Sequence, residues 1–83
     1  MRIVGNIPHP KITISIFAMN DKYQVKFEAG PMEQIFKFYG DEVSGVDAIK
    51  NIIDADFIDE VMTRFVEMFT SLKNLKEKHK LNV

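Results

Sequence analysis

The stretch KITISIFAMNDKYQVKFEA, residues 11–29, contains the pattern that decides the fold. Apolar and polar residues alternate on both sides of Asn20-Asp21, and such alternation is typical of strands that bury one face. Asn20-Asp21 suits a tight two-residue turn, because both residue types tolerate positive φ. The stretch therefore predicts a β-hairpin with strands over 11–19 and 23–29.

A two-residue turn also predicts the register of this hairpin. It places Ile16 opposite Val25, so that apolar residues of one strand meet apolar residues of the other. A slip of one residue would turn a whole strand over, which makes the register specific. The next break is Gly30-Pro31, and the run EQIFKFY (33–39) predicts a third strand with Phe36 opposite Val25.

The first ten residues, MRIVGNIPHP, are rich in residues that interrupt regular structure. Gly5, Pro8 and Pro10 allow at most a short strand at 2–4. We therefore expect residues 1–10 to form an N-terminal arm or a short strand.

After Gly40 the apolar period changes to that of a helix. Ser44 with Asp47 predicts a capping box and a short helix over about 45–53. Asp56 is then expected to cap a second, long helix.

The long helix has an unusually wide apolar face. At about 100° per residue its apolar side chains cover roughly half the circumference, whereas a helix on one core needs a stripe only a little over about 100° wide. These residues are Phe57, Ile58, Val61, Met62, Phe65, Val66, Met68, Phe69 and Leu72. Either this chain's own packing uses the whole face, or a second protomer covers part of it. Beyond Leu75, lysines fall on the apolar side, so the helix either leaves the core or frays there.

The predicted fold class is α+β. A three-stranded antiparallel meander is followed by a short and a long helix packed on one face (β-β-β-α-α). The 83 residues form a single domain, in which residues 76–83 are expected to be a basic, frayed tail.

Composition narrows the classes of function. Apolar residues make up 46% and charged residues 28% of the chain, as in an ordinary folded protein. The net charge of −1 argues against a dedicated binder of duplex DNA. The sequence has no cysteine, no run long enough to span a membrane and no secretory leader, so we expect a cytoplasmic protein.

No catalytic set can be named. His9 lies in the arm and His79 in the tail, and neither pairs with a serine or an acid in a recognisable pattern. The acidic residues over 54–60 lack the spacing of a calcium loop and are explained as helix-capping acids. The sequence therefore predicts a protein that is not an enzyme and that has no metal or cofactor.

Two surfaces remain for function, the wide helix face and the outer sheet face. They predict a small protein-interaction module, a homodimer or a binder of another protein. The candidate interface residues are Phe17, Met19, Ile35, Tyr39, Met62, Phe65 and Phe69. The alternative is a binder of single-stranded nucleic acid, because bases stack on aromatic rings while lysines hold the backbone. Its candidate residues are Phe17, Lys22, Lys26, Lys37, Tyr39, Lys76 and Lys80.

The runs IPHPKITISIFAMNDKYQVKFE and FIDEVMTRFVEMF resemble short uncharacterised proteins of Bacteroidetes-type bacteria. The resemblance covers most of the chain. It implies a conserved bacterial protein and transfers no functional residue.

Overall fold

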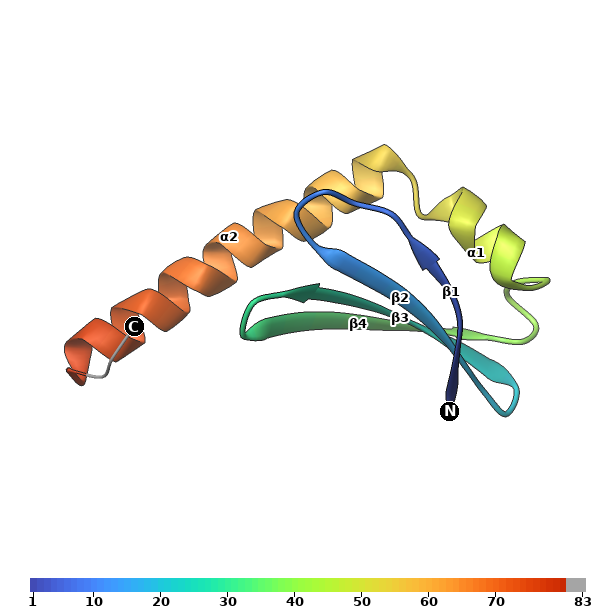
Figure 1. Ribbon diagram of the computed structural model, residues 1–83, viewed down its shortest axis with the longest axis horizontal. Coiled ribbons are helices and arrows are strands. Elements are labelled where there is room, and N and C mark those ends of the chain that lie inside the picture. Colours follow the sequence, from blue (N-terminus) through green and yellow to red (C-terminus); the bar gives the residue numbers. More distant parts are fainter. Residues whose placement is uncertain (81–83) are drawn as a thin grey trace.

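The computed structural model describes residues 1–80 and shows a four-stranded antiparallel sheet with both helices on one face (Figure 1). The strands follow one another across the sheet in the order β1-β2-β3-β4. The elements are β1 (Arg2–Ile7), β2 (Thr13–Met19), β3 (Lys22–Ala29), β4 (Met32–Tyr39), α1 (Val46–Ile52) and α2 (Ala55–Lys78). The α+β class and the antiparallel meander are confirmed, but the sheet has one strand more than predicted.

The predicted register of β2, β3 and β4 is confirmed. Ile16 lies opposite Val25, and Val25 lies opposite Phe36. The turns are tight, with Asn20 at φ 48° and Gly30 at φ 59°. Because Gly30 has no Cβ, it adopts this positive φ without steric cost.

Of the two expectations for residues 1–10, the strand is the one that the structure shows, but it is longer than the predicted 2–4: Arg2–Ile7 form the edge strand β1. Pro8 and Pro10 follow this strand and lie in the connection to β2, so they end β1 instead of preventing it. The pairing with β2 shifts between Ile3 and Gly5. A bulge of this kind lets a strand with an interrupted alternation remain in the sheet.

Gly5 lies close to α1. A Cβ at this position would lie 3.1 Å from Cγ1 of Val46 and 3.4 Å from Cε of Lys50. The absence of a side chain therefore lets α1 pack on β1.

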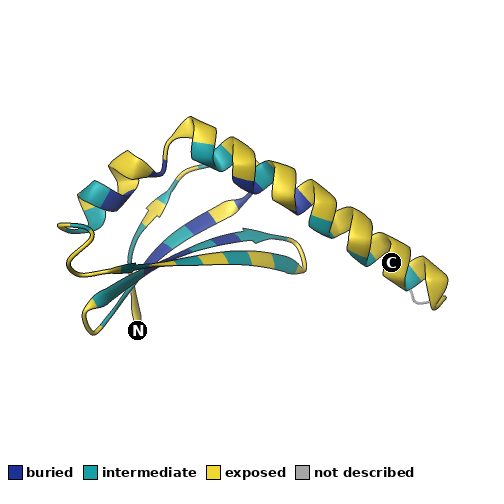
Figure 2. Ribbon diagram, turned by 180° about the vertical axis from the view of Figure 1, so that it is seen from behind, coloured by how far each residue is buried: buried dark blue, intermediate teal, exposed yellow. Residues whose placement is uncertain are grey.

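The core lies between the inner face of the sheet and the two helices (Figure 2). Its buried members are Ile12, Ile14, Ile16, Val25, Phe27, Ile49, Ile53, Val61 and Phe65. Phe27, Phe36 and Phe57 contact one another, with ring centroids 5.3–5.9 Å apart in edge-to-face or tilted geometry. Such contacts add to the free energy gained from burial alone.

Both predicted helix caps were wrong. α1 begins after Gly45, and no side chain caps it. α2 is capped by Asp54, whose Oδ1 accepts a hydrogen bond of 2.9 Å from the backbone N–H of Phe57. The helix thus begins before Asp56, which lies in its first turn and faces the positive end of the helix dipole.

α2 leaves the sheet and continues well beyond it (Figure 1). The helix continues to Lys78. The sequence left two alternatives near residue 76, that the helix leaves the core or that it frays, and the structure shows the first. Residues 81–83 of the predicted tail lie outside the described residues. The molecule measures 47 × 26 × 20 Å, and its radius of gyration is 14.9 Å. A compact domain of this length would have a radius of gyration of about 12 Å.

The two acidic residues at the start of α2 give a direct test of its cap. We expect Asp54→Ala to lower the free energy of unfolding by about 1 kcal/mol, because it leaves the Phe57 N–H without its acceptor. Asp56→Ala is the matched control and should cost only about 0.3–0.5 kcal/mol through the helix dipole. Urea denaturation of both variants measures the difference, and a larger loss for Asp56→Ala would show that the helix begins later than described.

Candidate interaction surfaces

The wide apolar face of α2 is only partly used by the chain itself. In the first half of the helix, Val61 and Phe65 are buried against the sheet. Further along, Val66 is 65%, Phe69 49% and Leu75 51% exposed. The intramolecular core therefore covers the face in the first half of α2 and leaves much of it exposed in the second.

A polar contact also joins the sheet to the first half of α2. The side-chain amide of Gln34 in β4 donates a hydrogen bond of 3.0 Å to the backbone carbonyl of Val61. This carbonyl already belongs to the helical ladder, so the bond uses its second lone pair. It ties α2 to β4 in addition to the apolar contacts of the core.

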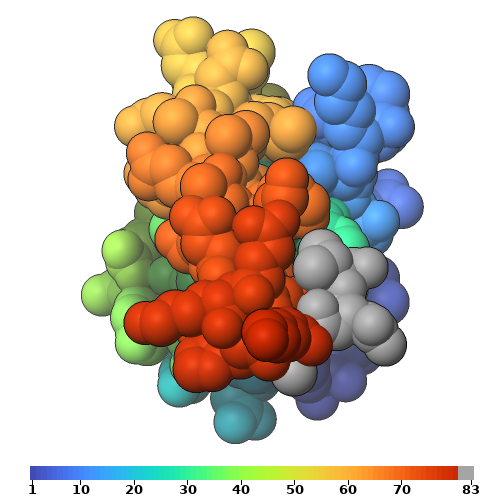
Figure 3. All heavy atoms as spheres, turned by 90° about the vertical axis from the view of Figure 1, so that its left-hand side faces the viewer, coloured from blue at the N-terminus to red at the C-terminus, as the bar shows by residue number. Residues whose placement is uncertain are grey.

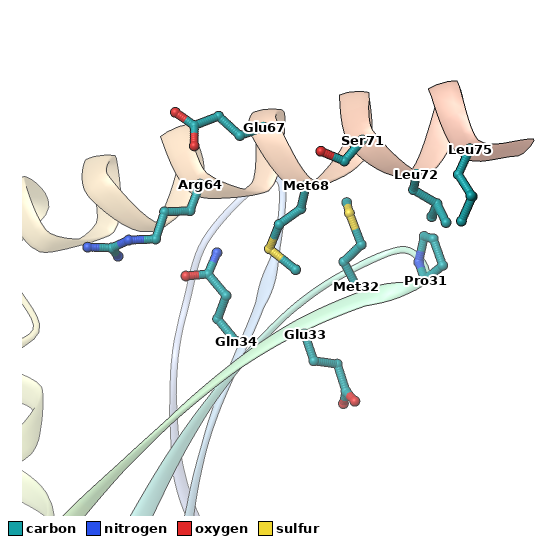
Figure 4. Close-up of a pocket in the computed structure, with 10 residues that line it drawn as sticks. All are labelled: Pro31, Met32, Glu33, Gln34, Arg64, Glu67, Met68, Ser71, Leu72 and Leu75. Atoms are coloured by element: carbon teal, nitrogen blue, oxygen red, sulfur yellow. The ribbon is translucent and has the colours of Figure 1, made fainter. Parts of the chain in front are cut away.

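Beyond this contact, α2 and the β3–β4 turn form the walls of an open groove of about 860 Å³ (Figure 4). Pro31 and Met32 lie on the sheet side, while Met68, Leu72 and Leu75 point toward them from the helix. Charged side chains border the groove from both elements, namely Glu33, Arg64 and Glu67. An apolar floor with a polar rim is the usual character of a protein-binding surface.

The three predicted helix residues differ in where they lie. Phe65 is only 4% exposed and belongs to the chain's own core. Met62 is partly buried against that core, and Phe69 is about half exposed. Of the three, Phe69 is therefore the one most available to a partner. The sequence could not separate them, because all three lie on the same wide stripe.

The outer face of the sheet lies opposite the helices and carries the predicted residues of β2 and β4. In one row Phe17 lies opposite Gln24, and in the next Met19 lies opposite Lys22. β1 adds Ile3, which pairs with Phe17 and is 66% exposed. Sequence reasoning missed Ile3, because the first ten residues were expected to form an arm or at most a short strand.

Lysines on this face already contact its aromatic rings and acids. Nζ of Lys22 lies 5.7 Å from the ring centroid of Tyr39, and Nζ of Lys26 lies 5.3 Å from that of Phe17. Lys26 also lies between two carboxylates, 3.7 Å from Glu28 and 3.4 Å from Glu33. It thereby offsets the like-charge pair that these two glutamates form across β3 and β4.

The candidate nucleic-acid residues do not form one surface. Those on the strands share the outer face, namely Phe17, Lys22, Lys26, Lys37 and Tyr39. Lys76 lies in the last turn of α2 and Lys80 just after it, on the helical side of the molecule. The structure therefore does not bring the lysine-rich tail together with the outer sheet face.

Asp54 of the acidic cluster and His9 have structural roles. Asp54 caps α2, and Nδ1 of His9 accepts a hydrogen bond of 3.1 Å from the backbone N–H of Lys11 in the β1–β2 connection. Within residues 1–80, histidine and carboxylate side chains form no group of three that could hold a metal ion. In the same part of the chain, neither helix combines the length and apolar character needed to cross a membrane.

No protein-family model, curated protein or solved structure matches this chain. An inference of function therefore rests on three surfaces of the chain. They are the groove, the part of α2 that extends beyond the sheet, and the outer sheet face.

The outer sheet face and the core can be distinguished by matched phenylalanine substitutions. Phe17→Ser should lower the free energy of unfolding by about 1 kcal/mol, because Phe17 is only partly buried and loses its cross-strand contacts and the contact of its ring with Lys26. Phe27→Ala should cost about 3–5 kcal/mol, because Phe27 is fully buried. Chemical denaturation measures both, and similar losses for the two variants would show that Phe17 is part of a covered core.

Proposed function

We propose that this protein is a small non-enzymatic interaction module that forms a homodimer through α2. The observation that carries the proposal is that α2 projects from the sheet while Val66 and Phe69, three residues apart on the helix, are 65% and 49% exposed. Figure 3 shows the C-terminal part of α2 at the front of the molecule. An amphipathic helix whose apolar face is not covered by its own domain gains free energy when a partner covers it.

The surface area of the chain supports this proposal. The accessible surface is 5881 Å², against about 5,100 Å² for a typical compact monomer of the same mass. The excess of about 800 Å² is close to the area that one partner contributes to a standard interface. A chain of 83 residues also has a small core, so burial of this surface would add materially to its stability.

The groove beside α2 gives the module a second apolar surface. Its walls come from two elements that the Gln34 hydrogen bond holds together. This surface lies on the flank of α2 that faces β4, whereas Val66 lies on another flank. Assembly through α2 would therefore leave room for a further segment in the groove.

Two neighbouring phenylalanines of α2 separate assembly from folding. Phe69→Asp should keep the helicity of the protein and abolish the dimer, because Phe69 is half exposed in the single chain. Phe65→Asp should unfold the protein, because it places a charge in the buried core at a cost of several kcal/mol. Size exclusion with light scattering and circular dichroism measure both properties.

The wild-type protein is the reference for this test. A mass of 9.6 kDa at every concentration up to hundreds of micromolar would contradict the proposed homodimer. A dimer that persists in Phe69→Asp would show that α2 is not its principal contact.

The alternative function, binding of single-stranded nucleic acid, is favoured by one observation. The aromatic rings of Phe17 and Tyr39 lie among lysines on the face of the sheet opposite the helices. This function predicts binding of mixed single-stranded RNA or DNA that weakens steeply with salt and is lost in Lys37→Glu. Mobility shifts at low and physiological salt measure it, and no shift at tens of micromolar protein would exclude it.

A further inference from the structure

A regular stripe of side chains runs along the flank of α2 that faces away from the groove. Its members recur at alternating spacings of three and four residues: Asp59, Met62, Val66, Phe69, Lys73 and Lys76. This is the spacing by which one helix packs along another in a coiled coil. Because Val66 is 65% and Phe69 49% exposed, the centre of the stripe is free to receive such a helix.

The stripe has opposite charges at its two ends. Its first member, Asp59, follows Asp54 and Asp56 at the start of α2, and its last members are Lys73 and Lys76. The centre consists of Met62, Val66 and Phe69. A helix with this arrangement is complementary to a copy of itself running in the opposite direction, since acidic and basic ends then meet.

In one register of the antiparallel alignment, every residue of the stripe faces a residue of compatible polarity in the second copy. Val66 packs against Phe69 of the second copy, and by symmetry Phe69 packs against its Val66. One layer outward, Met62 meets the aliphatic stem of Lys73, whose ammonium group can extend to solvent. In the next layer Asp59 lies opposite Lys76.

We propose that two copies of this chain pair through the Asp59–Lys76 stripe of α2, antiparallel about a twofold axis close to residues 67 and 68. The inference rests on the proposed homodimer and specifies its geometry. Parallel pairing is disfavoured, because it would place Asp59 beside Asp59 and each lysine beside its own copy. A shift of one heptad in the antiparallel alignment would place Phe69 against Asp59, where apolar contact is lost.

Charge exchange tests the alignment. Asp59→Lys places lysine opposite Lys76 at two symmetric positions and should weaken dimerisation about tenfold. Lys76→Asp should weaken it to a similar degree by placing two acids together. The double variant D59K/K76D should restore the wild-type dissociation constant within about threefold, because the opposite charges face each other again. Sedimentation equilibrium at low salt measures all four proteins.

Cysteine cross-linking tests the surface independently, and the chain contains no cysteine of its own. Val66→Cys should be linked to a covalent dimer by a short bismaleimide, because the two Val66 positions lie near the twofold axis. Ser71→Cys is the matched control: it is also near the middle of α2 but belongs to the groove flank. It should remain uncross-linked at the same protein concentration.

The outcomes distinguish the geometry from the function on which it rests. A monomeric wild-type protein would overturn the proposed homodimer together with this geometry. A dimer in which Ser71→Cys cross-links and Val66→Cys does not would retain the homodimer and overturn the stripe as its interface. A dimer in which D59K/K76D is weaker than either single variant would overturn the antiparallel alignment. Cross-linking through Val66 together with rescue by the double variant supports the proposal.

Discussion

The two-residue turn between β2 and β3 is the constraint on which the rest of the structure depends. It places Ile16 against Val25 and Ile14 against Phe27, so four apolar side chains share one face of the hairpin. All four are at most 1% exposed. The other strands extend this face, and both helices pack on it. A turn longer by one residue would distribute the same side chains over both faces and remove the platform that α1 and α2 need.

The sequence predicts those parts of the fold in which local pattern and packing agree. The alternation over 11–39 is regular, and its strands and register could be predicted without the structure. The full length of β1 could not be predicted, because the alternation of apolar and polar residues is broken at Gly5. Its position at the edge of the sheet depends on pairing with β2 through a bulge. The cap of α2 was placed two residues too late for a similar reason. Asp54 and Asp56 are both good capping residues, and only the path of the chain after α1 determines which one is used.

For the candidate surfaces, the sequence predicts which side chains lie together but not how far the sheet reaches. Phe65 and Phe69 are equivalent on the helix stripe, yet one is buried and the other half exposed. The difference arises because Phe65 is packed in the core next to Val61, which Gln34 contacts, whereas Phe69 lies one turn further along α2 and outside the core. Ile3 was missed on the outer face because it belongs to β1, which was not part of the predicted sheet. How far a side chain is buried on either surface thus depends on where the helix and strands lie relative to one another. The periodicity of residues within one helix or strand does not predict this.

The close approach of Gly5 to α1 also affects the order in which the fold can be completed. Each strand of the meander pairs with its neighbour in the chain, so the ladders close only short loops. The contact between Gly5 and Val46, by contrast, joins the first strand to a helix that follows all four strands. Loop closure costs more entropy as the intervening chain lengthens, and contacts of large sequence separation slow folding. The packing of α1 on β1 therefore costs more loop-closure entropy than the pairing of neighbouring strands, and a meander that is already formed lowers this cost by shortening the effective loop.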